Sequence, residues 1–186
     1  FPEKLIPLML KAGEMMTAVD NVESESVIKE KGGDLTNLVT EYDVSIQQYL
    51  IAEIKNILPT ACFIAEEKEN DPEMLQGSRC FIIDPIDGTI NFANGMPMWC
   101  IQIACRKDGE TVASVISLPK LGEFYYADQT GAYLNDQKIT VKEVPIKNTL
   151  YAIVGHDNIS ANERMRAYSR NNRNVGSIGV AYAFLA

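Results

Sequence analysis

The stretch Phe81-Ile82-Ile83-Asp84-Pro85-Ile86-Asp87-Gly88-Thr89-Ile90-Asn91-Phe92 decides how this chain is organised. Residues 81–83 are an apolar run whose Phe and Ile content and abrupt polar end predict a buried strand. Asp84 is then expected at the carboxyl end of that strand, where open α/β sheets keep their ligands. Pro85 restricts its own φ and keeps Asp84 out of the α region, so Asp87 is expected one short turn further on.

Two carboxylates this close repel each other unless a cation lies between them, and Mg²⁺ prefers hard oxygen ligands of this kind. Gly88 and Thr89 follow at an expected helix start, where free N–H groups suit an anion such as a phosphate. The pattern therefore suggests metal-assisted phosphoryl chemistry. Asp-Pro and Asp-Gly are also common turn dipeptides, and on spacing alone a simple chain reversal is the favoured interpretation.

Resemblance to a known family changes that balance. Residues 84–92 resemble the signature of the inositol monophosphatase family, which comprises Mg²⁺-dependent, lithium-sensitive phosphatases. Residues 37–43, Asn-Leu-Val-Thr-Glu-Tyr-Asp, resemble the family's second signature. Glu66-Glu67 is similar to its Gly-Glu-Glu motif, with Ala65 in place of the glycine. Residues 173–177 resemble its Arg-x-Val-Gly-Ser or Thr segment, which precedes a helix near the substrate pocket.

The resemblance implies three groups of site residues. The metal ligands are Glu66, Asp84, the main-chain carbonyl of Ile86, and Asp87, with Glu67 behind them. The catalytic residues are Asp43, Thr89 and Glu66. The substrate-binding residues are Asp87, Gly88, Thr89 and Arg173. In the implied mechanism, Asp43 and Thr89 orient and help to deprotonate a metal-activated water, and no covalent phosphoenzyme forms.

Two of these motifs also have a plainer structural interpretation. Thr40 and Asp43 are typical helix N-caps, since apolar residues continue at helical spacing to Pro59. Residues 66–69, Glu-Glu-Lys-Glu, are typical of a solvated charge run. The structural and the functional interpretations are compatible, and both are kept.

Composition restricts the class of protein. A hydrophobic fraction of 46% and a charged fraction of 23% over 186 residues are typical of a soluble globular protein of one domain or two small ones. The net charge of −8 argues against nucleic acid or an anionic membrane as the main partner. Cys62, Cys80, Cys100 and Cys105 show no Cys-x-x-Cys spacing and predict buried free thiols in a reducing compartment, here the cytoplasm.

Local patterns predict helical and extended segments in sequence order. Helices are expected over 3–17, from about residue 43 to 57, from Ser160, and after Ser177, where Val180, Phe184 and Leu185 would face the core. Strands are expected over 62–65, 99–106, 111–118, 123–127, 132–135, 138–141 and 150–154, with a hairpin turn at Asp108-Gly109. Residues 20–33 are expected to be irregular, and residues 70–77 to form a turn or helical loop.

These elements predict an α/β fold with layered helices and sheet, and the resemblance implies the α+β layered sandwich of the sugar-phosphatase superfamily. We expect one domain over residues 1–186 that is incomplete at its C-terminus. Residues 1–145 would be the N-terminal α+β part with the metal site, and residues 146–186 the start of the C-terminal α/β part. The family's Trp-Asp signature, whose aspartate completes the ligands of a second metal, is absent and is expected beyond Ala186.

The resemblance implies Mg²⁺-dependent hydrolysis of a small phosphorylated sugar or polyol, with inositol monophosphate first, by a homodimer. Other substrates of the superfamily are alternatives: fructose 1,6-bisphosphate, histidinol phosphate, adenosine 3′,5′-bisphosphate and NADP. A non-catalytic homologue that binds a metal or a partner is a further alternative. A nucleotide-binding module ranks last, because no Gly-rich phosphate loop with a following lysine is present.

Overall fold

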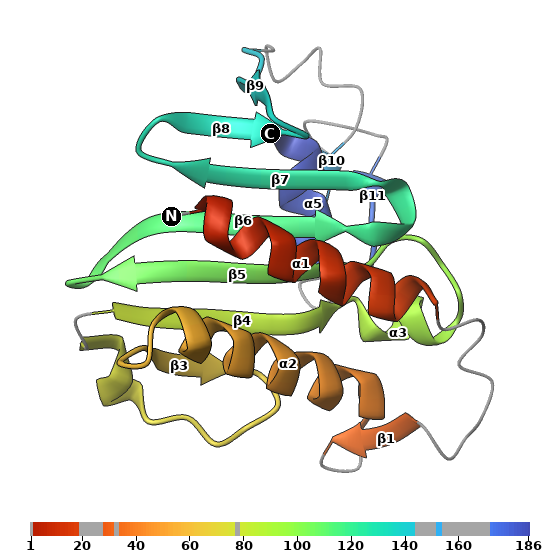
Figure 1. The fold of residues 1–186 in the computed structure, drawn as a ribbon. Coiled ribbons are helices and arrows are strands. Elements are labelled where there is room, and N and C mark those ends of the chain that lie inside the picture. The colour runs from red at the N-terminus through yellow and green to blue at the C-terminus, as the bar shows by residue number, and fades with distance from the viewer. Residues whose placement is uncertain (1, 19–27, 32–33, 77–78, 144–151, 154–171) are drawn as a thin grey trace.

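The structure, a computed structural model, describes residues 2–18, 28–31, 34–76, 79–143, 152–153 and 172–186. At its centre lies a seven-stranded sheet in which every neighbouring pair is antiparallel except β3 and β4 (Figure 1). In order across the sheet, the strands are β3 (Cys62–Ala65), β4 (Arg79–Asp87), β5 (Cys100–Lys107), β6 (Glu110–Leu118), β7 (Glu123–Asp128), β8 (Gly131–Leu134) and β9 (Gln137–Ile139).

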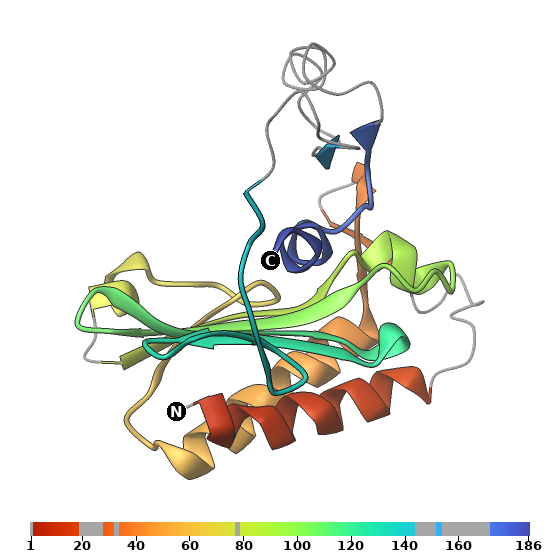
Figure 2. The same cartoon turned by 90° about the horizontal axis from the view of Figure 1, so that it is seen from above.

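Helices cover both faces of this sheet (Figure 2). α1 (Pro2–Thr17) and α2 (Glu41–Ile57) lie on one face, and α5 (Ile178–Leu185) lies on the other. The remaining described elements are short: β1 (Ile28–Lys31), β2 (Asp34–Thr40), η1 (Pro72–Gln76), α3 (Thr89–Ala93), η2 (Pro119–Leu121), β10 (Ala152–Ile153) and β11 (Asn172–Arg173). The predicted layered α/β fold is confirmed. None of the described helices combines the length and the apolar composition that crossing a bilayer requires.

The main core lies between the sheet and the helices α1 and α2. Side chains alternate across a strand, so Phe81 and Ile83 of β4 point to the same face. They join a buried cluster with Leu5 and Met9, one helical turn apart on α1, and with Leu50 of α2. Because most of the folding free energy comes from burying apolar surface, this layer fixes where β4 lies.

Two predictions about local structure are wrong. Ile28–Lys31 falls within the segment predicted to be irregular, yet it forms β1 and pairs antiparallel with β2. Pairing with a neighbouring strand overrides the weak local pattern. Leu185, predicted to face the core, is 55% exposed, whereas Val180 is 0% exposed and Phe184 is partly buried. Leu185 follows Ile178 and Tyr182 at helical spacing, so it lies on the same exposed side of α5.

Several predictions fall outside the described residues. These are the helix expected from Ser160 and all of the strand expected over 150–154 except β10. The single domain of residues 1–186 and its division after residue 145 therefore stay predictions.

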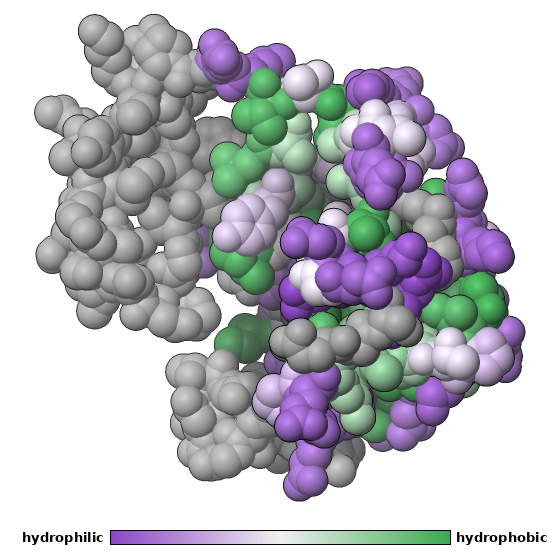
Figure 3. All heavy atoms as spheres, turned by 90° about the vertical axis from the view of Figure 1, so that its left-hand side faces the viewer, coloured by the Kyte–Doolittle hydropathy of each residue, from purple (hydrophilic) through white to green (hydrophobic). Residues whose placement is uncertain are grey.

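The outer side of α5 is apolar. Ile178 is 53% exposed, Tyr182 is 63% exposed and Leu185 is 55% exposed. Figure 3 shows hydrophobic side chains gathered in a strip beside polar side chains. α5 thus presents apolar surface to its surroundings as well as to the sheet.

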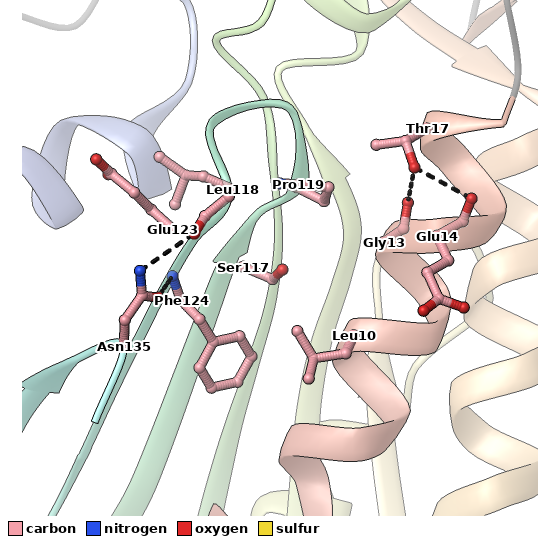
Figure 4. Close-up of a pocket in the computed structure, with 11 residues that line it drawn as sticks. Leu10, Gly13, Glu14, Thr17, Ser117, Leu118, Pro119, Glu123, Phe124 and Asn135 are labelled. Atoms are coloured by element: carbon pink, nitrogen blue, oxygen red, sulfur yellow. Dashed lines mark hydrogen bonds between the residues drawn. The ribbon is translucent and has the colours of Figure 1, made fainter.

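A hollow of about 270 Å³ lies between α1 and the end of the β6–β7 connection (Figure 4). Its lining includes the apolar side chains of Leu10, Leu118 and Phe124. Asn135 also lines it, and its Oδ1 accepts a hydrogen bond from the Phe124 N–H at 2.9 Å. None of the residues that line it is a predicted site residue. The candidate site therefore lies elsewhere on the sheet.

Two leucines of α1 provide a matched test of this packing. Leu5 is 0% exposed and Leu10 is 50% exposed. We expect Leu5→Ala to lower the free energy of unfolding by about 3 kcal/mol, because it leaves a cavity in the core, and Leu10→Ala to lower it by about 1 kcal/mol or less. Urea unfolding followed by circular dichroism measures both values, and equal losses would contradict this placement of α1.

Candidate active site

A shift of register in β4 places two carboxylates on the same face of the sheet. Three chain steps separate Asp84 from Asp87, which in a regular strand would direct them to opposite faces. Their Cα partners on β5, Gln102 and Cys100, are only two steps apart. The extra residue in β4 forms a β-bulge, a position that suits Pro85 because proline has no N–H to donate.

This arrangement corrects one prediction and confirms another. The strand does not end at Asp84 with a turn at Pro85, but continues to Asp87. Gly88 is the N-cap of the short helix α3, which begins at Thr89, so the helix start lies where the sequence predicts it. Because of the bulge, Asp84 and Asp87 lie on the same face of the sheet while both remain in β4.

Asp84 is the least satisfied group of the site. Its Oδ2 accepts a hydrogen bond from Gln102 Nε2 at 3.1 Å, but its Oδ1 is buried and finds no donor among the described residues. Burial, followed by the negative charges of Glu66 and Asp87, raises the pKa of Asp84 to about 8. A hollow of about 280 Å³, lined in part by Ala104, adjoins Asp84 and Gln102.

β3 carries Glu66 to the same place. β3 runs parallel to β4, and the Glu66 N–H donates to the Ile83 carbonyl at 3.2 Å, so the pairing continues past the end of the strand. Asn70 holds the outer edge, because its side chain bonds both the N–H and the carbonyl of Ala65, at 2.9 and 2.7 Å. Glu66 is exposed, and its negative charge acts on Asp84.

A buried glutamine of α2, Gln47, holds the main chain of Glu67 in place. Gln47 is 3% exposed, and its Oε1 accepts from the Glu67 N–H at 2.8 Å. This contact ties the main chain of Glu67 to the helix layer, and the predicted role of the Glu67 side chain behind the metal ligands stays a prediction.

Asp87 is held by the N-terminus of α5. Its Oδ2 accepts from the Ser177 hydroxyl at 2.8 Å and from the Gly179 N–H. Ser177 is the N-cap of α5 and also accepts from the Val180 N–H at 3.1 Å. The positive end of the helix dipole favours a carboxylate here. All these contacts use Oδ2, which leaves Oδ1 of Asp87 for a ligand.

Close packing explains the glycine at position 179. A Cβ atom on Gly179 would lie 2.5 Å from Cys100 Sγ and 2.9 Å from Asp87 Oδ2. Burial, followed by the charge of Asp87, raises the pKa of the Cys100 thiol well above its ordinary value. Cys100 thus lies beside Asp87 as a thiol whose burial disfavours the charged form.

Asp43 and Thr89 meet as the family resemblance implies. Asp43 lies in the first turn of α2 and is 1% exposed. Thr89 Oγ1 lies 3.3 Å from Asp43 Oδ1 and 3.0 Å from the carbonyl oxygen of Ile86. A hydroxyl has one proton to share between two acceptors, so Thr89 keeps lone pairs for a third group. The predicted N-cap role is wrong for Asp43, which follows the helix start at Glu41.

Aromatic packing braces this contact. Tyr42 of α2 meets Phe92 of α3 edge-on at 5.8 Å between ring centroids, and Phe92 meets Trp99 in the same way at 5.1 Å. Asn91, 7% exposed, donates to the carbonyls of Met98 and Val175. These contacts tie α3 both to α2 and to the segment that precedes α5.

The structure gathers most of the predicted site residues but not all. Asp43, Glu66, Asp84, Asp87 and Thr89 lie along one edge of the fold, linked by the contacts above. Arg173 lies in β11 with an exposed side chain, and its role stays a prediction. The sequence analysis missed Gln102 and Gln47, whose only signal is a polar side chain at an inward position of an apolar strand or helix.

The site fits a divalent cation in part. Among the described residues, no three His, Cys, Asp or Glu side chains are arranged as a group that holds a metal ion. What the structure offers is the buried, unpartnered Oδ1 of Asp84 beside two further carboxylates. Mg²⁺ keeps several waters and needs few protein ligands, so an open set of oxygens is compatible with it.

Comparison with known proteins gives a consistent result. The sequence model of the inositol monophosphatase family matches residues 3–186. A protein of Thermotoga maritima named fructose-1,6-bisphosphatase/inositol-1-monophosphatase is 33% identical over 97% of this chain and 69% of its own length. A protein of Vibrio cholerae named Nus factor SuhB is 32% identical over 77% of this chain and 52% of its own length. The chain thus spans between half and about two thirds of these relatives.

The fold agrees as well. The crystal structure of an IMPase of Thermotoga maritima matches with a TM-score of 0.82 at 31% identity, over 97% of this chain and 70% of that chain. The predicted fold class is therefore confirmed by an independent comparison.

Gly88 offers a test of the packing at the site. Its φ is +93°, and a Cβ there would lie 3.0 Å from the Met98 carbonyl oxygen and from Ser177 Cβ. Gly109, in the β5–β6 turn, has a φ of +84° and nothing within 4 Å of such a Cβ. We expect Gly109→Ala to cost about 1 kcal/mol of unfolding free energy through backbone strain alone, and Gly88→Ala to cost at least about 1 kcal/mol more through crowding. Denaturant unfolding of both variants measures the difference, and equal costs would contradict the close approach of α5 to Gly88.

Proposed function

Because this chain belongs to the inositol monophosphatase family, we propose that it hydrolyses a small phosphate monoester with the help of Mg²⁺. The observation that carries the proposal is the buried Oδ1 of Asp84, which has no donor among the described residues and is flanked by Glu66 and Asp87. Such a group is unfavourable in a folded protein unless a cation or a proton compensates it.

The residues that would hold the cation are Glu66, Asp84, Asp87 and the main-chain carbonyl of Ile86. Bound there, Mg²⁺ would activate a water and neutralise charge on the phosphate. The protein's part is to keep these oxygens in place. Gln102 orients Asp84 and the N-terminus of α5 orients Asp87, each through the oxygen Oδ2.

Asp43 and Thr89 would orient the attacking water and help to remove its proton. The Thr89 hydroxyl lies 3.3 Å from Asp43 Oδ1, so it donates toward that carboxylate and accepts with its lone pairs from the attacking water. Asp43 is buried in the first turn of α2, so bulk water has little access to its carboxylate. No covalent bond between protein and phosphate is needed.

Substrate contacts are the least constrained part of the proposal. Gly88 and Thr89 would present main-chain amides to the phosphate at the start of α3, and Asp87 and Arg173 would contact the rest of the ester. Inositol monophosphate is the first candidate, and fructose 1,6-bisphosphate is the second, because the relative from Thermotoga maritima carries both names. A homodimer and a cytoplasmic location belong to the same proposal. The free cysteines Cys62, Cys80, Cys100 and Cys105 support the reducing compartment.

A second candidate function is the binding of a partner without turnover. The observation that favours it is the name Nus factor SuhB, borne by a relative that is 32% identical. The contact between Asp43 and Thr89 favours catalysis instead, since partner binding does not require a hydroxyl set between a buried carboxylate and a carbonyl.

Thr89 gives the sharpest test of the catalytic proposal. We expect Thr89→Ala to lower kcat for phosphate release by about 10²- to 10⁴-fold, because the water loses the group that accepts its proton. Thr89→Ser keeps the hydroxyl and should retain most of the activity. Release of inorganic phosphate from inositol 1-phosphate and fructose 1,6-bisphosphate, with Mg²⁺ and with a chelator, measures the effect.

Circular dichroism of each variant controls for folding. Full activity of Thr89→Ala would overturn the assigned role of the hydroxyl. Absence of phosphate release from every ester tested, both by the unaltered chain and by a version extended beyond Ala186 to include the family's Trp-Asp signature, would favour partner binding.

A further inference from the structure

Cys62 and Cys80 lie side by side on the two parallel strands of the sheet. Cys62 begins β3, Cys80 is the second residue of β4, and the two are Cα partners in the ladder. Neighbouring strands lie about 4.8 Å apart. The Cα atoms of a disulfide lie about 4.4 to 6.8 Å apart, so the backbone already meets this requirement. Both cysteines are free thiols in this structure.

The two thiols also point to the same face. Phe63 and Phe81, the next residues in the ladder, stack on each other in the core beneath α1 and α2, at 5.8 Å between ring centroids. Because side chains alternate along a strand, Cys62 and Cys80 face the opposite side. Cys105 pairs with Phe81 and therefore points to the core side, away from this pair.

The electrostatics support close contact between the two sulfurs. Burial, followed by the negative charge that Cys62 would carry, raises the pKa of the Cys80 thiol. Arg106 and Lys68 oppose that rise, so both cations lie near enough to Cys80 to favour its thiolate. The net direction is upward, so these cations moderate the pKa of the Cys80 thiol without lowering it below its ordinary value.

The two thiols differ in solvent exposure, and this difference gives each a separate role in oxidation. Cys62 is partly exposed, whereas Cys80 is 0% exposed. An oxidant in solution therefore meets Cys62 first, and Cys80 is placed to attack it from within the protein. β3 is an edge strand of four residues, so small movements of its first residue disturb little else.

We propose that Cys62 and Cys80 form a redox modification site that closes into a disulfide when the protein meets a hydroperoxide. In the first step, the Cys62 thiolate attacks the peroxide oxygen and becomes a sulfenic acid, and the other oxygen leaves as water or an alcohol. In the second step, the Cys80 sulfur attacks Cys62 Sγ, the S–S bond forms and the hydroxyl leaves as water. The two thiols lose two electrons and two hydrogens in total, and the peroxide is reduced.

The site is independent of the phosphatase proposal but lies on the same two strands. Along one face, the ladder runs from the pair Cys62 and Cys80, through Ile64 and Ile82, toward Glu66 and Asp84. Four residues of strand, or about 13 Å, separate the thiol pair from these carboxylates. The crosslink would fasten the edge strand that carries Glu66 to the strand that carries Asp84.

The test is to treat the purified chain with a small excess of hydrogen peroxide, quench it, and count free thiols before and after reduction. We expect the count to fall from four to two and to recover with dithiothreitol. Peptide mapping under non-reducing conditions should join the peptides of Cys62 and Cys80. Cys62→Ser and Cys80→Ala should each abolish the crosslink, while Cys105→Ser, at an equally buried cysteine, should leave it intact.

Three results would overturn the proposal. One is a crosslink that joins Cys80 to Cys105. Another is oxidation of Cys62 to sulfinic acid with no crosslink at all. The third is unchanged crosslinking in Cys62→Ser, the variant least able to disturb the fold because this side chain is partly exposed. Each readout is a mass or a thiol count, so none depends on phosphatase activity.

Discussion

The concentration of negative charge around Asp84 is the constraint on which the rest of the site depends. A bulge at Pro85 directs Asp84 and Asp87 to one face, and the parallel strand β3 adds Glu66 beside them. Gln102 donates a hydrogen bond to Oδ2 of Asp84, while Oδ1 is buried and has no donor among the described residues. Buried charge of one sign is costly, so this arrangement is stable only with a proton or a cation in place.

The surrounding elements position these carboxylates. Asn70 fixes the main chain before Glu66 through amide hydrogen bonds, and the N-terminus of α5 contributes a hydroxyl and an N–H to Asp87. Carboxylate oxygens held in this way are the hard ligands that a divalent cation prefers.

Much of this could be predicted from the sequence, for physical reasons. The antiparallel run from β5 to β9 follows alternating apolar residues and turn dipeptides such as Asp108-Gly109, which are local signals. The bulge at Pro85 could not be predicted, because it depends on the register with β5. Gln102 and the contact of Ser177 with Asp87 also escaped local patterns, since they join residues 18 and 90 positions apart. The metal ligands came from family resemblance, and their roles are still proposals.

The most direct test of the central claim is calorimetric titration of the chain with Mg²⁺ in buffers of different ionisation enthalpy. The pKa of Asp84 is raised to about 8, so at pH 7 this carboxyl holds a proton that a cation must displace. The account predicts saturable binding that releases close to one proton at pH 7 and much less at about pH 9, and that is lost in Asp84→Asn. An unchanged binding curve in Asp84→Asn, or no Mg²⁺ binding by the unaltered chain, would contradict it.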